Sequence, residues 1–350
     1  MKPRCAIVEC YNRHDEVYLT TVHLLNRLGY HVDVFTSFRN RLKNSFVYTD
    51  SLDYELRWRF SGSRVLDPQA YRGYDLLVFN TFEGAAVLDA ARRLIQGVPI
   101  IAFVHNASFL KRGPEYRYFL EHRRCRFAVL APYVRDHIAD VTDALYMFPV
   151  FFHDRPLPGG HPDNGKRLFC VQGYFDSSRR QYGALVDALA SLQASGRGDF
   201  EALVMGRNFS LDFRSFHAEV ERRGLSRFLR YAWKGIGYRS YYGLLSKVDF
   251  ILPLLTPKSH PDYFDGKVTS SVSAAIGFGK LPVVDETLAA CYGATAASFT
   301  YAGSLAPAMQ RALDASGDEL ASLRQRLASV KEDCLRRSLE QMQRAVAELA

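Results

Sequence analysis

Short runs of consecutive apolar residues recur along this chain and constrain its fold more than any other feature. They include 75–80 (DLLVFN), 99–104 (PIIAFV) and 250–255 (FILPLL). A strand that is apolar at every position, rather than at alternate ones, is typical of a parallel sheet covered on both faces. Segments with apolar residues three and four apart lie between the runs and indicate helices. This alternation predicts an α/β protein.

The alternation occurs twice, and 350 residues exceed the usual size of one hydrophobic core. Residues 153–166 (HDRPLPGGHPDNGK) concentrate Pro, Gly, Asp and His, as linkers do. We therefore predict an N-terminal Rossmann-like domain over 1–152, a linker over 153–166 and a C-terminal Rossmann-like domain over 167–316. A last helix over 317–350 is expected to pack back on the body, since its apolar residues recur at helical spacing.

Each domain is expected to form a doubly wound sheet, and the two domains are expected to face each other across a cleft. Ligands of such sheets bind at the carboxyl ends of the strands, often where two domains meet. Side chains that directly follow a strand are therefore the candidates for chemistry.

The composition is typical of a globular protein, with 48% hydrophobic and 23% charged residues and a net charge of +8. Basic and aromatic residues interleave over 111–126, where an anionic acceptor, an anionic membrane surface or RNA could bind. A solvated basic surface is the alternative interpretation. Because the six cysteines form no C-x-x-C pair, we expect reduced thiols, with no disulfide framework and no zinc site.

The N-terminal sequence has no signal-peptide pattern, and no apolar run approaches about 18 residues. A cytoplasmic protein is therefore expected, with peripheral contact at a membrane left open. Several catalytic signatures are also absent. The lack of G-x-G-x-x-G removes the main support for a dehydrogenase, and the lack of D-x-D removes the usual sign of a metal-dependent transfer.

The segment 262–285 (DYFDGKVTSSVSAAIGFGKLPVVD) predicts a short helix of small residues, Ser270–Phe278, between two buried strands. Thr269 or Ser270 can cap its N-terminus, and Gly279 suits the left-handed position that ends a helix. A helix that begins at the end of a parallel strand directs unpaired N–H groups and a partial positive charge into the crevice above the sheet.

The start of this helix suits a doubly negative diphosphate. Lys267 precedes it, and the cap and first turn carry the hydroxyl groups of Thr269, Ser270 and Ser271. The alternative is an ordinary helix whose small residues allow it to approach the sheet closely.

Further candidates follow the other strands of the second half. Gly173 permits close approach of the backbone to a ligand, and Tyr174 or Phe175 after it could stack on a nucleobase, with core packing as the alternative. Basic residues near neighbouring strand ends could neutralise a departing diphosphate without a metal ion. These are Arg179 and Arg180, at the start of a helix predicted from about Ser178 to Ala194, together with Arg207 and Lys267.

Histidines follow two strands of the first half. His14 and Asp15 come after the first strand, where an enzyme that inverts configuration needs a general base beside a carboxylate. Neighbouring residues on a helix do not face each other, so Glu16 or a distant acid could replace Asp15 in that role. His105 follows another strand and faces the expected cleft. Capping, acceptor positioning or a loop contact are the alternatives for these histidines.

Four segments resemble glycosyltransferases of the GT-B fold, most closely the retaining bacterial surface-polysaccharide group (glycosyltransferase family 4-like). They are 24–36 (LLNRLGYHVDVFT), 99–106 (PIIAFVHN), 241–255 and 276–284 (IGFGKLPVV). The resemblance implies a metal-independent transfer of a sugar from a nucleotide-diphosphate sugar to a hydroxyl of a glycan or lipid-linked acceptor. It implies a donor in the C-terminal domain, an acceptor in the N-terminal domain and no cofactor beyond the nucleotide sugar as co-substrate.

The same resemblance implies that His105 contacts the donor sugar. Two positions depart from the pattern of the group. The loop after the first strand, 11–16, is not rich in glycine, and the pair of glutamates eight residues apart is replaced by Asp265 and Ser273. The surviving carboxylate of Asp265 remains a candidate for donor binding, and the base, the sugar, the acceptor and the stereochemistry stay open.

Two other functions remain as alternatives. A nucleotide-sugar 2-epimerase would use the same fold for another reaction. A non-catalytic relative that binds sugar or RNA would account for the missing carboxylate, although nucleic acid is the less favoured partner.

Overall fold

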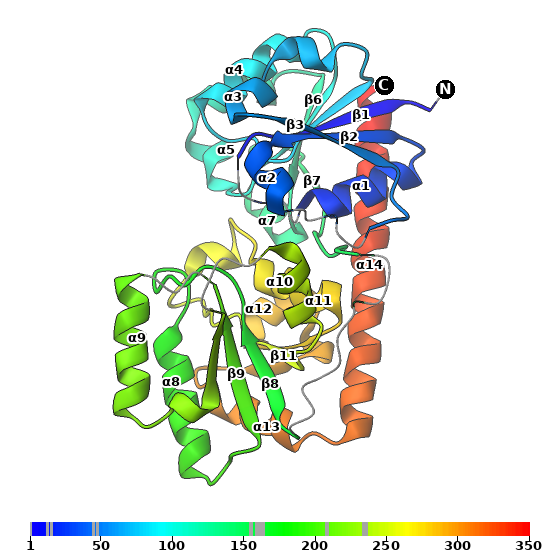
Figure 1. Ribbon diagram of the computed structural model, residues 1–350. Helices are drawn as coiled ribbons and strands as arrows, with labels where there is room; N and C mark the ends of the chain where they lie inside the picture. Colours follow the sequence, from blue (N-terminus) through cyan, green and yellow to red (C-terminus); the bar gives the residue numbers. More distant parts are fainter. Residues whose placement is uncertain are drawn as a thin grey trace. The chain divides into compact units, whose positions relative to one another are not determined.

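The computed structural model describes residues 2–11, 14, 17–43, 46, 49–153, 157, 165–206, 210–232 and 237–350. The chain divides into two compact units (Figure 1). Unit 1 comprises Met1–Pro156, Asp265–Val268 and Asp333–Ala350, and unit 2 comprises Leu157–Phe264 and Thr269–Glu332. Most of the predicted linker, 154–156 and 158–164, lies outside the described residues.

Unit 1 is built on a parallel sheet of seven described strands in the order β3-β2-β1-β4-β5-β6-β7. The strands are β1 (Arg4–Glu9), β2 (His31–Ser37), β3 (Tyr54–Arg59), β4 (Leu76–Phe79), β5 (Ile100–Phe103), β6 (Cys125–Val129) and β7 (Leu145–Tyr146). The helices are α1 (Val17–Arg27), α2 (Phe38–Lys43), α3 (Gly62–Val65), α4 (Ala85–Leu94), α5 (Ser108–Arg112), α6 (Arg117–Leu120) and α7 (Pro132–His137), with short 3-10 turns at Pro68–Tyr71 and Pro114–Tyr116.

Unit 2 is built on a second parallel sheet, of six described strands in the order β10-β9-β8-β11-β12-β13. The strands are β8 (Arg167–Val171), β9 (Phe200–Met205), β10 (Leu229–Ala232), β11 (Phe250–Ile251), β12 (Leu281–Asp285) and β13 (Phe299–Tyr301). The helices are α8 (Tyr182–Ala194), α9 (Leu211–Arg222), α10 (Tyr238–Leu245), α11 (Ser270–Phe278), α12 (Glu286–Cys291) and α13 (Ala306–Asp314), with 3-10 turns at Ser226–Phe228, Pro261–Phe264 and Thr295–Ala297. The last helix, α14 (Gly317–Leu349), belongs to unit 2 up to Glu332 and to unit 1 from Asp333.

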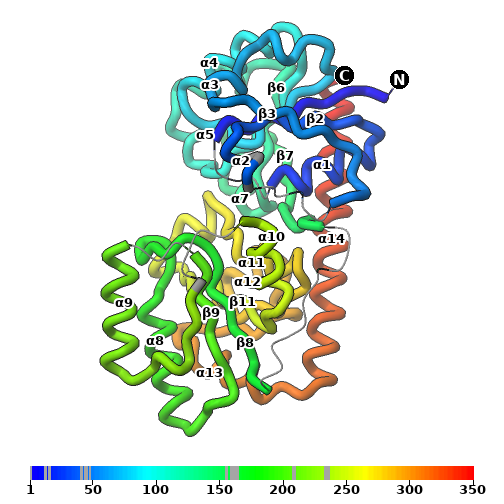
Figure 2. Tube along the Cα trace, in the orientation of Figure 1, coloured from blue at the N-terminus to red at the C-terminus, as the bar shows by residue number. Residues whose placement is uncertain are grey.

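The prediction of two doubly wound α/β units is confirmed. Every residue of β4, β5 and β9 is buried, as expected of strands covered on both faces. In unit 2, α8 and α9 lie side by side (Figure 2). The long helix α14 buries Leu320 and Leu327 in its first half, and Cys334 and Met342 in the part that belongs to unit 1.

Helix α11 has the predicted bounds, because local rules fix both of its ends. The Thr269 hydroxyl accepts a hydrogen bond from the Ser271 N–H (3.3 Å), and Gly279 ends the helix at φ 65° and ψ 33°. The Lys280 N–H then donates to the Ala275 carbonyl (2.8 Å), which satisfies one of the last carbonyl groups of the helix.

Two predicted elements are shorter than expected. The helix predicted from residue 178 begins at Tyr182, because the Asp176 carboxylate accepts from the Ser178 N–H (2.9 Å) and holds this stretch in a turn. The strand predicted over 250–255 ends at Ile251, and Leu254 takes a left-handed conformation (φ 57°) that no strand contains.

None of the described helices combines the length and the apolar character that crossing a membrane requires.

Candidate functional site

Each sheet has one place where the strand order reverses, between β1 and β4 in unit 1 and between β8 and β11 in unit 2. The helices that connect the strands leave in opposite directions there, which opens a crevice at the carboxyl ends of the strands. Ligands of doubly wound sheets bind at these switch points. Most of the residues that the sequence singles out lie at one or the other.

The switch point of unit 1 is organised by Glu9, the last residue of β1, which is fully buried. Its carboxylate accepts hydrogen bonds from Asn80 Nδ2 (2.7 Å), Thr81 Oγ1 (2.8 Å) and the Tyr11 N–H (2.8 Å). Three donors satisfy a buried anion, which would otherwise be costly. Asn80 Nδ2 also donates to the His14 carbonyl (2.9 Å), so the same network holds the loop that carries His14.

His14 has a left-handed backbone (φ 56°), which is strained for a residue with a side chain. Its ring stacks on His105, with centroids 3.6 Å apart and an angle of 12° between the planes. Nδ1 of His14 lies 3.4 Å from Thr81 Oγ1. Because the Thr81 hydroxyl gives its proton to Glu9, its oxygen is set to accept from an N–H at Nδ1. In that tautomer Nε2 is the basic nitrogen.

His105 lies two residues after β5, with Nε2 2.7 Å from the Asn80 carbonyl, to which it donates. Part of the residue is exposed, but the surrounding protein keeps water from most of the ring. This burial lowers the pKa of His105 to about 4, and the hydrogen bond to Asn80 opposes the shift. The imidazole is therefore neutral near pH 7. Asp15, the predicted partner of His14, lies outside the described residues.

The switch point of unit 2 is organised around Gln172, the residue that follows β8. Its Nε2 donates to Ser270 Oγ (3.2 Å) and Ser271 Oγ (3.3 Å), and its Oε1 accepts from the Tyr241 hydroxyl. Gln172 thereby ties the end of a central strand to the first turn of α11. The hydroxyl groups of this turn are exposed at Ser270 and buried at Ser271, and Thr269 is buried as the cap.

Arg180 places a buried positive charge beside this turn. Its side chain is 8% exposed, and Nη2 donates to Ser271 Oγ (3.3 Å). Nε is buried without a hydrogen-bond partner among the described residues. Arg179, by contrast, is largely exposed and pairs with Asp176 (3.3 Å). Of the two adjacent arginines that the sequence offers, Arg180 is the one that reaches the start of α11.

Two glycines let the strand ends of unit 2 approach each other. Gly173 has φ 106°, and a Cβ there would lie 2.8 Å from Arg180 Nη2. Gly206, after β9, has φ 154°, and a Cβ there would lie 2.1 Å from the Gly173 carbonyl oxygen. Tyr174 is 53% exposed beside them, whereas Phe175 is fully buried and stacks on Tyr182 in the core. Arg207, which the sequence also predicted here, lies outside the described residues.

The segment Asp265–Val268 is held within unit 1 by its main chain. The Ala107 N–H donates to the Gly266 carbonyl (2.9 Å), and the Tyr133 hydroxyl donates to the Lys267 carbonyl (2.7 Å). The exposed carboxylate of Asp265 lies 4.0 Å from His137 Nδ1. Asp265 and Lys267, which the sequence assigns to donor binding, therefore belong to unit 1, whereas Thr269, Ser270 and Ser271 belong to unit 2.

Sequence reasoning missed three residues of unit 2. Gln172 ends an apolar strand with a polar residue, a signal that was visible in the sequence. Tyr241 and His260 had no such signal, because they reach this region only in the fold. Burial and the charge of Arg180 lower the pKa of His260, so this histidine lies close enough to sense the guanidinium.

One group of described side chains, His31, Asp33 and Glu55, has the spacing of a metal site. The oxygens of Asp33 already accept from Arg4 Nη2 (2.8 Å) and Arg57 Nε (2.8 Å). A cation would have to displace two arginines. These residues therefore form an ion-pair network that does not fit a metal.

The basic segment over 111–126 is partly engaged within the protein. Lys111 pairs with Asp140 (3.1 Å), and Arg126 pairs with Glu348. Arg124 donates to the carbonyl groups of Gln96 and Gly97. This segment therefore offers an anionic partner fewer cations than its sequence indicates.

No protein-family model matches the sequence, and no curated protein sequence matches it. Solved structures do match over the whole chain. A glycosyltransferase from Rickettsia africae has a TM-score of 0.63 at 11% identity and covers 99% of this chain and 98% of its own. Anabaena HepE, solved with UDP, has a TM-score of 0.65 at 14% identity and covers 99% of this chain and 100% of its own.

A UDP-forming trehalose-phosphate synthase from Burkholderia xenovorans has a TM-score of 0.61 at 12% identity and covers 99% of both chains. The chain has the GT-B fold. Identities this low establish the architecture and leave the chemistry to the residues of the site. The membership of the retaining group that the sequence resembles therefore stays a prediction.

Proposed function

We propose that this GT-B protein is a glycosyltransferase that moves a sugar from a nucleotide-diphosphate sugar to a hydroxyl of a glycan or lipid-linked acceptor, without a metal ion. One observation carries the proposal: the buried guanidinium of Arg180 donates to Ser271 Oγ at the start of α11, beside the switch point of unit 2. A cation, a helix N-terminus and hydroxyl groups together suit a leaving diphosphate.

The proposed donor site uses the residues of unit 2 in separate roles. The diphosphate binds at the first turn of α11, where Ser270 offers an exposed hydroxyl and Arg180 offers a charge. The close approach of Gly173 and Gly206 brings the ends of β8 and β9 together beside Arg180. The exposed ring of Tyr174 stacks on the base. A uridine base is favoured, because HepE was solved with UDP.

Three further residues complete the proposal. His14 takes the proton of the acceptor hydroxyl, since Thr81 is set to accept from Nδ1 and the tautomer makes Nε2 basic. His105 contacts the sugar as a neutral imidazole. Lys267 adds a second positive charge for the diphosphate, and Asp265 stays a candidate for the donor sugar.

A thermal-shift screen against UDP-, GDP-, ADP- and CMP-sugars tests the donor, since a ligand that binds only the native state raises the melting temperature. The proposal expects a UDP-sugar to give the largest shift and calorimetry to give a weaker affinity for Lys267→Ala. Unchanged affinity would remove Lys267 from the diphosphate site. If no nucleotide sugar bound, the proposed glycosyltransferase function would be excluded.

Product analysis with the selected donor distinguishes the rival reactions. Transfer to a glycan or lipid-linked acceptor supports the proposal. Release of nucleotide with an epimerised sugar and no acceptor would assign the chain as a 2-epimerase. Binding without turnover would assign it as a sugar-binding relative, in keeping with Ser273 at the position of the second carboxylate.

A further inference from the structure

Exposed apolar side chains gather at one place in unit 1. Seven large apolar side chains are exposed among the described residues, and three of them lie on α2 or directly after β3. They are Phe38 (37% exposed), Leu42 (70%) and Phe60 (75%). The ring of Phe38 lies 5.3 Å from that of Trp58 and 6.1 Å from that of Phe60, so these three rings form one cluster. Leu42 lies one helical turn from Phe38 on α2. We call Phe38, Leu42, Trp58 and Phe60 the apolar edge.

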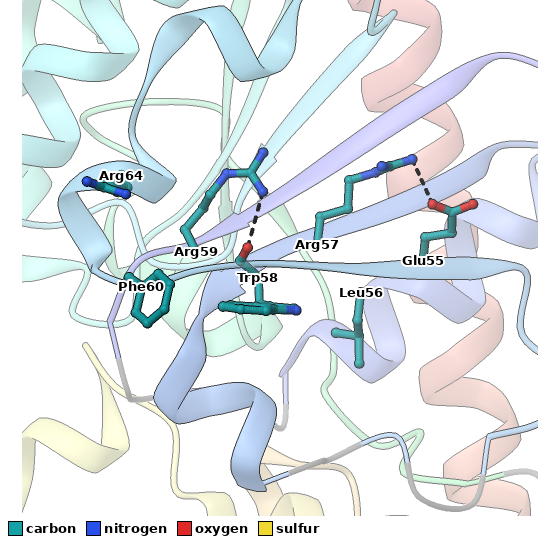
Figure 3. Close-up of a pocket in the computed structure, with 7 residues that line it drawn as sticks. All are labelled: Glu55, Leu56, Arg57, Trp58, Arg59, Phe60 and Arg64. Atoms are coloured by element: carbon teal, nitrogen blue, oxygen red, sulfur yellow. Dashed lines mark hydrogen bonds and ion pairs between the residues drawn. The ribbon is translucent and has the colours of Figure 1, made fainter.

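The apolar edge lies along the strand at one end of the described sheet. β3 is the first strand of its sheet and pairs with β2. Its side chains alternate, with Leu56 and Trp58 on one side and Arg57 and Arg59 on the other (Figure 3). A cavity of 460 Å³ runs along the strand, lined by Glu55–Phe60 and Arg64.

The segment that carries the apolar edge has a net positive charge. Residues 38–64 contain six Lys or Arg and three Asp or Glu, which is a net +3 of the +8 of the chain. Arg57 is engaged by Asp33 and Glu55. Arg39 and Arg64 are exposed, and neither forms an ion pair with any other residue that the structure describes. Both guanidinium groups can therefore bind an anion outside the protein.

The chemistry of this surface discriminates among its occupants. A second copy paired edge to edge would bring its own positive charges against these, which destabilises a sheet contact. A nucleic acid would satisfy the arginines but would gain little from Leu42. A bilayer rich in anionic phospholipid satisfies both, because apolar side chains enter the acyl boundary while arginines bind the headgroup phosphates.

We propose that the apolar edge, flanked by Arg39 and Arg64, docks this protein on an anionic membrane surface. Phe38, Leu42 and Phe60 enter the boundary between headgroups and acyl chains, and the two arginines bind lipid phosphates at the headgroup level. The inference goes beyond the proposed function, since no step of sugar transfer enters it and the binding needs no nucleotide sugar.

Sedimentation with vesicles tests the proposal on the full chain without substrate. The protein should bind vesicles of equal parts phosphatidylglycerol and phosphatidylcholine, and bind vesicles of phosphatidylcholine alone far more weakly. Rising salt should weaken the binding, because the headgroup charges are screened. The double variant Leu42→Ala/Phe60→Ala should reduce partitioning by about tenfold or more. The double variant Arg39→Glu/Arg64→Glu should reduce it by about tenfold at low salt.

Matched controls come from unit 2, where Leu211 is 77% exposed and Arg214 is exposed on α9. Leu211→Ala and Arg214→Glu should leave partitioning unchanged. All the variants change exposed side chains, so their melting temperatures should stay close to that of the original chain. A melting curve for each variant therefore separates lost docking from lost folding.

Fluorescence reports whether the edge enters the lipid. The chain has two tryptophans, so a Trp233→Phe background leaves Trp58 as the reporter. Lipids brominated on the acyl chain should quench Trp58 when the protein binds anionic vesicles. Equal binding to neutral vesicles, or loss of binding only in the charge variant and not in the apolar one, would overturn the proposal. Binding of single-stranded RNA through the same residues, without vesicle binding, would also overturn it.

Discussion

The switch point of unit 1 contains a buried carboxylate, Glu9, whereas that of unit 2 contains a buried guanidinium, Arg180. Both lie where the strand order of a doubly wound sheet reverses. Unit 1 uses its anion to fix two histidines, and unit 2 uses its cation to extend the positive end of a helix. The same topology thus provides one crevice suited to accepting a proton and another suited to holding an anion.

The largest expected effect is on turnover and concerns the general base proposed in unit 1. His14→Ala should lower kcat by about 10²–10⁴-fold with little change in donor affinity, because general-base catalysis typically contributes that much. Initial rates with an identified acceptor, and calorimetry with the donor nucleotide, would measure the two quantities separately. His23→Ala is a control in unit 1, since its ring stacks on Phe151 (4.2 Å) and not on His105. Retained turnover in His14→Ala would exclude this histidine as the base.

The next largest effect is on donor affinity and concerns the arginine proposed to bind the diphosphate in unit 2. Arg180→Ala should weaken binding of the donor nucleotide by about 30–1000-fold, because removing a buried, hydrogen-bonded charge costs about 2–4 kcal/mol. Arg179→Ala is the matched control, since this arginine is exposed and pairs with Asp176. Its affinity should stay within about twofold of the original. Calorimetry measures the affinity of both variants for the donor nucleotide. Similar losses of affinity in the two would contradict the assignment of diphosphate binding to Arg180.

The contrast between the two arginines marks the limit of prediction from sequence. The bounds and caps of α11 followed from Thr269 and Gly279, because capping depends on a few neighbouring residues. The buried strands followed from their apolar runs. The choice between Arg179 and Arg180 depends on the turn that Asp176 forms, and the sequence predicted a helix there.

Contacts between distant residues were also beyond local rules. Gln172 reaches Ser270 and Ser271 across almost a hundred positions, and nothing in either segment encodes the pairing. The assignment of Asp265–Val268 to unit 1 likewise depends on hydrogen bonds to Ala107 and Tyr133. Sequence reasoning placed the candidate residues after the strands of both sheets and could not assign each side chain to its partners.

A third prediction concerns the pH dependence of unit 1. Burial lowers the pKa of His105 to about 4, below the value of an unfolded histidine. The neutral ring therefore contributes stability that is present above about pH 6.5 and is lost as the pH falls toward 4. The neutral ring of His105 should contribute about 2–3 kcal/mol to the free energy of unfolding. His105→Gln should show a smaller loss of the free energy of unfolding between pH 7.5 and 4.5, measured by urea denaturation.

A matching loss in the original chain and in His105→Gln would show that the titration of His105 does not contribute. The comparison of the two chains therefore shows how much the neutral ring of His105 contributes to the pH dependence of the free energy of unfolding.

The smallest expected effects separate two neighbouring hydroxyl groups of α11. Ser270 is exposed, so Ser270→Ala should weaken nucleotide binding by about 2–10-fold, the range of one hydrogen bond, and leave the melting temperature unchanged. Ser271 is buried and accepts from Gln172 and Arg180. Ser271→Ala should therefore destabilise the fold by about 1–3 kcal/mol, because it leaves buried donors without their acceptor.

Ser271→Ala should also weaken binding, since Arg180 loses the contact that holds it at the helix start. Measuring the affinity and the melting temperature of both variants separates contact with the ligand from support of the guanidinium. If Ser270→Ala lowered the melting temperature while Ser271→Ala did not, the assignment of the two hydroxyl groups would be reversed. If neither changed the affinity, the diphosphate would not bind at this turn, and the anion-holding role of unit 2 would have to lie elsewhere on its sheet.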